Sequence, residues 1–450
     1  MSKDKQKLSK GQRKKIAKQA AQLNISSVES LPAVESDSAV ENKIYERLTQ
    51  PRTINREYKK MRLECVSPVY IGSGETLKAV EYLYNSEQQT VYFLDESKWI
   101  KFLFDKNLID EFANYVELTA KDSARNEEFI GNNVWNWLKS LFEKPNKIKN
   151  AELTALSIRQ ALATTNTIIS RRQTLNDIAC HIATADGRPY IPGSSIKGIF
   201  RTAILHSFIK NFSAAQKNKY WSEIFATKNL HLKAQQKKCE EIIQRLENEI
   251  FSKLNYKTAD AQVKSVMRGL IVSDALGVNK QIKTVILQKI DSSTKANRRG
   301  QTEKTLPLFR ECIPAGTKFD FTVTLDLDIL EKIGVHSVEE ILTMSQEFML
   351  DGTNLLKEVF GAQYPNEFAE IERATAFIGG GTGFIATTLL YSLAPSIEDG
   401  KNFIANYFDK TFWHSHKSND EKISPRTLKL TKSSTKKQIF GLCKLQVTQC

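Results

Sequence analysis

Two cations, Lys197 and Arg201, stand four residues apart in the stretch "IPGSSIKGIFRTAIL" (191–205). Apolar residues recur there at the three-and-four spacing of one helical face, which predicts that both cations lie in the first turns of a helix. Because a helix amino end already carries partial positive charge, two cations beside it are locally unfavourable. An anion bound nearby would remove the conflict. The alternative is that both side chains simply extend into solvent.

The residues just before these cations are typical of a turn that leads into a helix. Pro192 and Gly193 interrupt the preceding segment, and Ser194 or Ser195 can cap the first free amides of the helix. Free amides at a helix start bind anions, so the turn and the two cations together form a candidate anion site.

Glycine-rich segments offer a second route to anion binding, because glycine permits positive φ and close approach of a backbone to a ligand. The stretch "FIGGGTGF" fails the nucleotide-binding patterns, since it has no GK[ST] and Phe384 stands where the dinucleotide pattern needs glycine. A structural turn is at least as good an interpretation. "IGSG" (71–74) is a weaker case of the same kind. The residues concerned are Gly72, Ser73, Gly74, Gly379, Gly380, Gly381 and Gly383.

No group of residues has the spacing of a known catalytic or metal-binding motif. The six cysteines form no CxxC pair, and Glu75 with Glu81 would make only a thin carboxylate cluster. We therefore expect no catalytic residue, no metal site and no cofactor. His181, ten residues before Ile191, is the one histidine close to the candidate anion site and could serve as an acid or base.

Positive charge is concentrated in three segments. The net charge is +14, and residues 1–24, 280–310 and 411–450 carry +7, +6 and +6, which leaves −5 for the rest of the chain. Clustered cations on a mildly acidic body are typical of polyanion binding, although any one segment could be an ordinary solvated surface.

The middle basic segment connects two predicted strands, and its long basic connection predicts a projecting hairpin. Its candidate polyanion-binding cations are Lys295, Arg298 and Arg299.

The bulk properties are those of a soluble globular chain of 450 residues with 41% hydrophobic and 26% charged residues. No apolar run approaches the ~20 residues that span a bilayer, so we expect no membrane association. The amino-terminal segment lacks the apolar core of a secretory signal, and the scattered cysteines suit a reducing compartment. We expect a cytoplasmic protein.

Strands and helices alternate along the chain in a pattern typical of an α+β fold. Helices are predicted over 97–118 and 337–359, and strands over 268–276, 281–291 and 318–330. Residues 375–393 are predicted to form a strand, a glycine loop and a helix.

Four stretches together resemble the RAMP superfamily of CRISPR proteins. They are "LECVSPVYIGSGE", "YIPGSSIKGIFRTAIL", "FIGGGTGF" and "SPRTLKLTKSSTKKQIFGLCKLQV", and the resemblance spans roughly residues 60–450. "IPGSSIKG" with Arg201 is typical of RAMP proteins in general. The first and last stretches are most similar to subunits that cap the 3′ end of crRNA in type III-A Csm complexes.

The resemblance implies ferredoxin-like, RRM-like halves that bind crRNA without cutting it. It implies a first half at 61–225, a helical insertion at 226–264 and a second half at 265–450, after a basic flexible arm and linker at 1–60. The stacking aromatics of RRM motifs are not recognisable, so we expect binding through backbone and loops. The implied RNA site includes the glycine and basic residues named above, with Gly193, Ser194, Ser195, Lys197, Arg201, Arg426 and Lys429.

The partners that the resemblance implies are crRNA, neighbouring RAMP subunits of the Csm complex and, transiently, target RNA; host nucleases are a further candidate. Two other functions stay open at this point. One is a metal-independent endoribonuclease that processes or trims crRNA. The other is a basic assembly factor that binds RNA without specificity.

Overall fold

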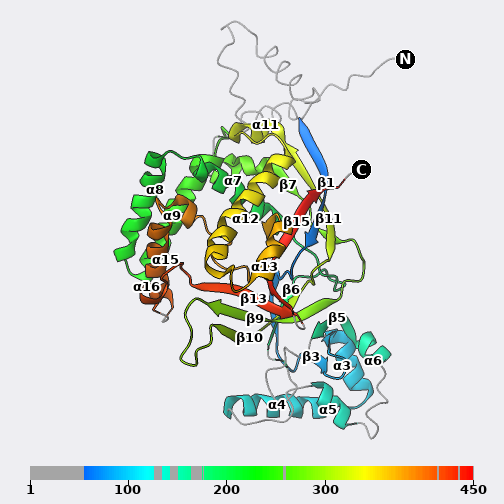
Figure 1. Ribbon diagram of the computed structural model, residues 1–450. Coiled ribbons are helices and arrows are strands. Elements are labelled where there is room, and N and C mark those ends of the chain that lie inside the picture. Colours follow the sequence, from blue (N-terminus) through cyan, green and yellow to red (C-terminus); the bar gives the residue numbers. More distant parts are fainter. Residues whose placement is uncertain are drawn as a thin grey trace, which may run out of the picture.

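The computed structural model describes residues 55–125, 134–141, 150–163, 175, 177–256, 260–412, 415–433 and 436–448. Helices and strands alternate along the chain (Figure 1), which confirms the expected mixture of α and β structure. The strands are β1 (Arg56–Cys65), β2 (Gly72–Leu77), β3 (Tyr82–Asn85), β4 (Thr90–Leu94), β5 (Ser157–Ala163), β6 (Ile178–His181), β7 (Leu270–Val272), β8 (Leu276–Gly277), β9 (Thr284–Ser293), β10 (Glu303–Cys312), β11 (Lys318–Asp326), β12 (Ala376–Phe377), β13 (Thr427–Ser433), β14 (Lys436–Ile439) and β15 (Leu442–Val447).

The helices are mostly short, and one long helix crosses the middle of the molecule (Figure 1). That helix, α12, fulfils the expectation for 337–359. The helices are α3 (Glu96–Asp105), α4 (Ile109–Arg125), α5 (Val134–Ser140), α6 (Asn150–Leu156), α7 (Gly193–Lys210), α8 (Ala214–Ala226), α9 (Leu232–Phe251), α10 (Ala261–Lys264), α11 (Leu327–Leu330), α12 (Val338–Phe360), α13 (Pro365–Ala369), α14 (Leu390–Leu393), α15 (Ile397–Thr411) and α16 (His416–Asn419). Within the described ranges, no helix has the length and apolar character needed to span a bilayer.

The strands form two sheets in the described part of the chain. The first has the order β12-β15-β1-β11-β7, with β8 also paired to β11. The second has the order β2-β6-β10-β9-β5-β4-β3, and β13 and β14 extend it through β9. The first sheet joins strands that are far apart in sequence, since β1 pairs antiparallel with both β11 and β15.

One face of the first sheet is buried because helices pack against it. Met61 and Leu63 of β1 are fully buried and belong to the same cluster as Ile196, Phe200 and Ile204 of α7. These α7 residues are the apolar face that the spacing predicts. Burying each such side chain contributes about 1.5–3 kcal/mol. The helix α7, which carries Lys197 and Arg201, is therefore packed firmly against the sheet.

The prediction of one continuous helix over 97–118 is wrong, because this segment forms two helices, α3 and α4. Asn107 between them has φ 55°, a left-handed conformation that asparagine tolerates better than most residues and that ends a helix. The expected strand over 268–276 is likewise interrupted, and only β7 and the start of β8 are extended.

A buried ion pair links β5 and β10, the two strands that flank β9 in the middle of the second sheet. The Arg159 guanidinium of β5 donates to both oxygens of Glu311 of β10, at 2.9 and 3.0 Å, and the Glu311 side chain is completely buried. The same carboxylate accepts hydrogen bonds from the Thr284 hydroxyl and the His181 amide. All of its strong acceptor positions are therefore satisfied within the fold.

Replacing Arg159 with Ala should lower the free energy of unfolding by about 3–5 kcal/mol, because it leaves the Glu311 charge buried and unpaired. Chemical denaturation followed by circular dichroism measures this loss. Arg62→Ala is the matched control, since Arg62 also makes a bidentate pair with Asp320 but on an exposed surface. A loss of stability no larger in Arg159→Ala than in the control would contradict the structural role of the buried pair.

Candidate nucleic-acid interface

Three backbone segments from distant parts of the sequence meet at the glycine loop. The Gly380 amide donates to the Tyr70 carbonyl at 2.7 Å, and the Gly441 amide donates to the Pro68 carbonyl at 2.9 Å. The Ile378 amide donates to the Gly441 carbonyl at 2.8 Å. The structure thus brings together three of the four stretches that carry the family resemblance.

Glycine is required in this loop by crowding. Gly379 has φ +84°, and a Cβ there would lie 2.1 Å from the Tyr70 carbonyl oxygen. At Gly381, with φ +97°, a Cβ would lie 2.5 Å from Nη1 of Arg310. Because the Gly380 amide is bonded to Tyr70, it is not free to hold a phosphate. The interpretation as a structural turn therefore accounts for this part of the loop.

Arg310 is a cation at this loop that the sequence analysis did not single out. Its guanidinium carbon lies 5.1 Å from the centre of the Tyr70 ring and 5.7 Å from that of Phe440, distances typical of cation–π contacts. Its Nη1 is buried and has no hydrogen-bond acceptor. The only sequence signal for Arg310 was its position at the end of the basic segment 280–310.

The start of α7 differs from the expectation. Neither Ser194 nor Ser195 caps the helix; Pro192 precedes its first residue and makes no side-chain cap. The Gly193 amide instead donates to Oδ1 of Asp274 at 2.7 Å. A carboxylate at a helix amino end is electrostatically favourable. The Asp274 carboxylate thus supplies, from within the chain, part of the negative charge that offsets Lys197 and Arg201 at the start of α7.

Gly193 is needed for this contact, since a Cβ there would lie 2.4 Å from the Val272 carbonyl oxygen. Asp274 can reach the helix because the chain leaves the sheet between β7 and β8. The break in the expected strand over 268–276 and the cap on α7 therefore have one structural origin.

The two α7 cations have different surroundings. Arg201 forms an ion pair with Glu247 of α9, and its guanidinium lies 5.7 Å from the centre of the Phe251 ring. Lys197 has no acidic partner among the described residues, and burial lowers the pKa of its amine. Of the two, Lys197 is the cation that is available to an external anion.

A cavity connects α7 to the glycine loop. Its volume is about 300 Å³, and it lies between α7, α12 and the segment 376–387. Ser195 and Gly379, two of the expected site residues, both line it. The helix start and the glycine loop, almost two hundred residues apart in sequence, thus form one surface feature.

The candidate cations near the carboxyl end also have internal partners. Lys429 lies beside the loop, where a Cβ on Gly383 would be 3.2 Å from its Cγ. Its amine lies 3.0 Å from Asp291, and burial lowers its pKa. The Arg426 guanidinium donates to the fully buried Asp420 carboxylate at 2.6 Å. Arg426 is therefore placed to stabilise the fold.

The remaining expected residues lie on two exposed segments. β9 and β10 pair in antiparallel register from Ser292 and Glu303, and Lys295, Arg298 and Arg299 occupy the connection between them. On β2, Gly72, Ser73 and Gly74 are exposed, and Gly74 has φ +93° with open space where a Cβ would be. Neither segment lines the cavity beside the glycine loop.

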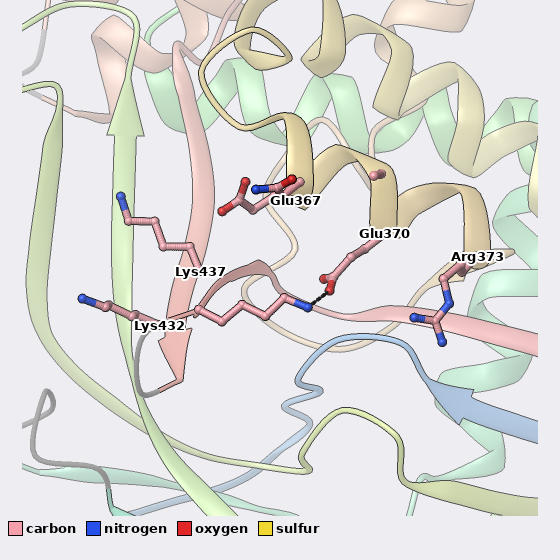
Figure 2. A pocket seen from close by; sticks show the side chains of 8 residues that line it. Glu367, Glu370, Arg373, Lys432 and Lys437 are labelled. Carbon is pink, nitrogen blue, oxygen red and sulfur yellow. Dashed lines mark hydrogen bonds and ion pairs between the residues drawn. The ribbon is translucent and has the colours of Figure 1, made fainter.

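A cationic cleft that the sequence analysis did not identify lies beside α13 (Figure 2). Its volume is about 750 Å³. Lys436 pairs with Glu370 across it, and Lys437 pairs with Glu303. Lys432 forms no close ion pair among the described residues, although its charge helps to lower the pKa of Glu303, and Figure 2 shows its amine extending away from Glu370. The net positive charge of residues 411–450 was the only sequence signal for this cleft.

His181 is held by two backbone contacts that leave its ring no free nitrogen. Its Nδ1 accepts from the Ile71 amide at 3.1 Å, and its Nε2 lies 3.1 Å from the Tyr190 carbonyl oxygen. The first contact requires an unprotonated Nδ1, so the ring is neutral and Nε2 donates. Burial lowers the pKa of His181 to about 4. A buried, neutral ring with both nitrogens bonded is not placed to transfer a proton to RNA.

No metal centre emerges elsewhere in the ranges that the structure describes, where no three His, Cys, Asp or Glu side chains gather as a metal ion would require.

The burial of His181 has a pH dependence with a definite sign. Between pH 6.5 and 4 the unfolded chain binds a proton at this histidine that the folded chain does not, so stability falls as the pH falls. The loss reaches about 3 kcal/mol at pH 4, at 1.36 kcal/mol per pKa unit. Urea unfolding at pH 7 and pH 4.5 should show a smaller pH effect in His181→Gln than in the parent. An equal pH effect in both proteins would mean that His181 titrates normally.

A family model described as the RAMP superfamily matches residues 62–385. Among curated proteins, the chain is 25% identical to the CRISPR system Cms protein Csm5 of Mycobacterium tuberculosis strain H37Rv, over 86% of this chain and 97% of that protein. It is also 25% identical to the protein of the same name from Streptococcus thermophilus, over 73% of this chain and 79% of that one.

Two solved structures have a similar fold. One chain belongs to the cryo-EM structure of a Csm–crRNA–target RNA ternary complex of a type III-A CRISPR-Cas system. It matches with a TM-score of 0.58 and 17% identity over 87% of this chain and 100% of that chain. The crystal structure of T. onnurineus Csm5 matches with a TM-score of 0.52 and 15% identity over 85% and 99%. Since the family model covers most of the sequence, and the motifs it shares meet around one glycine loop, this chain belongs to the RAMP superfamily.

Proposed function

We propose that this protein is a non-catalytic, crRNA-binding subunit of a type III-A Csm effector complex and that it caps the 3′ end of the crRNA. Its similarity to Csm5 proteins over most of its length supports the assignment to this complex. The observation that carries the RNA-binding role is the convergence of α7, the glycine loop and the Tyr70 segment beside one cavity.

The arrangement suits an RNA backbone better than a nucleotide. The cavity beside the loop, at about 300 Å³, is at the lower limit of the usual range for small-molecule sites, about 300–1,000 Å³. Lys197 lies on α7 two residues after Ser195, which lines the cavity, and has no acidic partner among the described residues. A single-stranded phosphate running past α7 would give Lys197 that partner and offset the cost of its burial.

The finer architecture is part of the same proposal. The halves at 61–225 and 265–450 would be ferredoxin-like units joined by an insertion at 226–264, with the basic β9–β10 hairpin crossing the guide. The partners would be crRNA, neighbouring RAMP subunits, target RNA and host nucleases, in the cytoplasm. Residues 1–54, most of the basic arm and linker at 1–60, lie outside the described residues.

Lys197→Ala should weaken crRNA binding and reduce the slope of log affinity against log salt by about 0.7, the share of one single-strand phosphate contact. Fluorescence anisotropy with labelled crRNA from 50 to 300 mM salt measures both quantities. Arg201→Ala is the matched control, because its cation is already paired with Glu247. A slope that is unchanged in Lys197→Ala, with the fold intact, would remove Lys197 from the RNA site.

Copurification from the host tests the proposed function as a whole. The tagged full chain should bring down Csm subunits and crRNA of defined 3′ ends, and the complex without this chain should contain crRNA with altered 3′ ends. Sequencing of the bound RNA measures both results. Recovery of bulk cellular RNA without enrichment of crRNA would favour the non-specific assembly factor instead.

The endoribonuclease alternative has its own test. We expect the purified chain to cut neither crRNA precursor nor target RNA, with or without divalent metal, because His181 is neutral and bonded on both sides. Denaturing gels of labelled RNA show whether cleavage occurs. Cleavage by the parent that disappears in His181→Gln or Glu75→Ala would contradict the non-catalytic assignment.

A further inference from the structure

The first sheet has an open face. Along β1, Met61 and Leu63 point into the core, whereas Tyr58, Lys60 and Arg62 alternate with them on the opposite face. Figure 1 shows α7 and α12 on one side of these strands. The short α11 contacts both β1 and β11, and the 3-10 turn Val266–Gly269 contacts β11, whereas Tyr58, Lys60 and Ile271 stay exposed. The outer face is therefore available to a partner.

An aromatic side chain lies on the central strand of that face. Tyr58 is 56% exposed and stands opposite Thr324 of β11, which in turn stands opposite Ile271 of β7. Ile271 is 54% exposed. A large aromatic side chain that is exposed on a sheet surface offers a platform on which a planar base can stack.

Cations lie along the same face of the sheet, with Arg56 and Lys60 on either side of Tyr58 and Lys444 opposite Glu64 further along β1. Arg62 is neutralised by Asp320 in a bidentate pair, and Glu64 lies within 4 Å of both Lys318 and Arg373. In contrast, Arg56 and Lys60 of β1 and Lys444 of β15 are exposed and have no acidic partner in the ranges described. Asp320 and Glu64 are thus paired, Asp326 stands opposite Arg56, and the cations of this face outnumber its acids. A polyanion complements such a surface.

We propose that the open face of the first sheet is a second contact for single-stranded RNA, with a base stacked on Tyr58 and phosphates bound by Lys60 and Lys444. The inference rests on the proposed RNA-binding function and adds a stacking site to it. Tyr58 and Lys60 precede residue 62, where the family match begins.

The site also revises an expectation from the sequence. Tyr58 lies in no recognisable RRM motif, and only its exposure on a central strand shows it as a stacking residue. Same-face neighbours on a strand are about 6.8 Å apart, two residues at 3.4 Å each. Lys60 therefore lies about 6.8 Å from Tyr58 along the strand. At this distance Lys60 can bind a phosphate of the same RNA strand whose base stacks on Tyr58.

Tyr58→Ala in the full chain should weaken binding of a fluorescein-labelled, unstructured 20-nucleotide RNA about tenfold or more, the effect of losing one stacked base. Tyr58→Phe keeps the ring and should bind as the parent does. Phe104→Ala removes a 69% exposed aromatic from α3, away from this face, and should also leave affinity unchanged. Unchanged urea midpoints in all variants show that the fold is kept.

Crosslinking of the same RNA containing 4-thiouridine supplies a readout that does not depend on affinity. The peptide that contains Tyr58 should be labelled in the parent protein. The double variant Lys60→Ala/Lys444→Ala should lower the salt slope by about 1.4, two single-strand phosphate contacts.

The possible outcomes separate this inference from the one on which it rests. If the parent binds no RNA, both fail. If the parent binds RNA and Tyr58→Ala binds equally well, with no crosslink at Tyr58, the stacking site alone is wrong. Loss of Csm-subunit binding with intact RNA affinity in Tyr58→Ala would make the face a protein interface and overturn the inference.

Discussion

The close approach of Gly379 to Tyr70 is the constraint on which the candidate RNA surface depends. The two backbones are so near that any side chain at Gly379 would collide with the Tyr70 carbonyl. This contact fixes the chain between β1 and β2 against the loop that follows β12. α7 packs on the first sheet, which contains β1, through Ile196 and Phe200. The contact between Gly379 and Tyr70 therefore helps to set the positions of α7, the glycine loop and the exposed strand β2.

Internal pairing decides which of the many cations can meet RNA. Arg201, Arg426 and Lys429 each have a carboxylate within the chain, and the acid is completely buried in the Arg426 pair and largely buried in the other two. The net charge of +14 therefore overstates the positive surface that is available. Lys197 and the open-face cations acquire their importance because the fold gives them no acidic partner in the described residues.

Local pattern predicted α12 and the apolar face of α7 from the sequence, because spacing alone determines which side chains share a helical face. The break at Asn107 was missed, since asparagine is only weakly disposed to left-handed backbone and the apolar pattern continues across it. Asp274 as the cap of α7 could not have been predicted, because it lies 81 residues from Gly193. Tyr58 was missed for the same reason, since its exposure depends on strands brought from the far end of the chain.

The most direct test of the central claim is the map of protein–RNA crosslinks in the purified ribonucleoprotein complex, with 4-thiouridine placed along the 3′ half of the crRNA. The account predicts labelled peptides around Lys197 and in the segment 376–387, from the same few nucleotides, because these elements border one cavity. Crosslinks confined to α3–α6 or to the cleft beside α13, with none near Lys197 or the glycine loop, would contradict it.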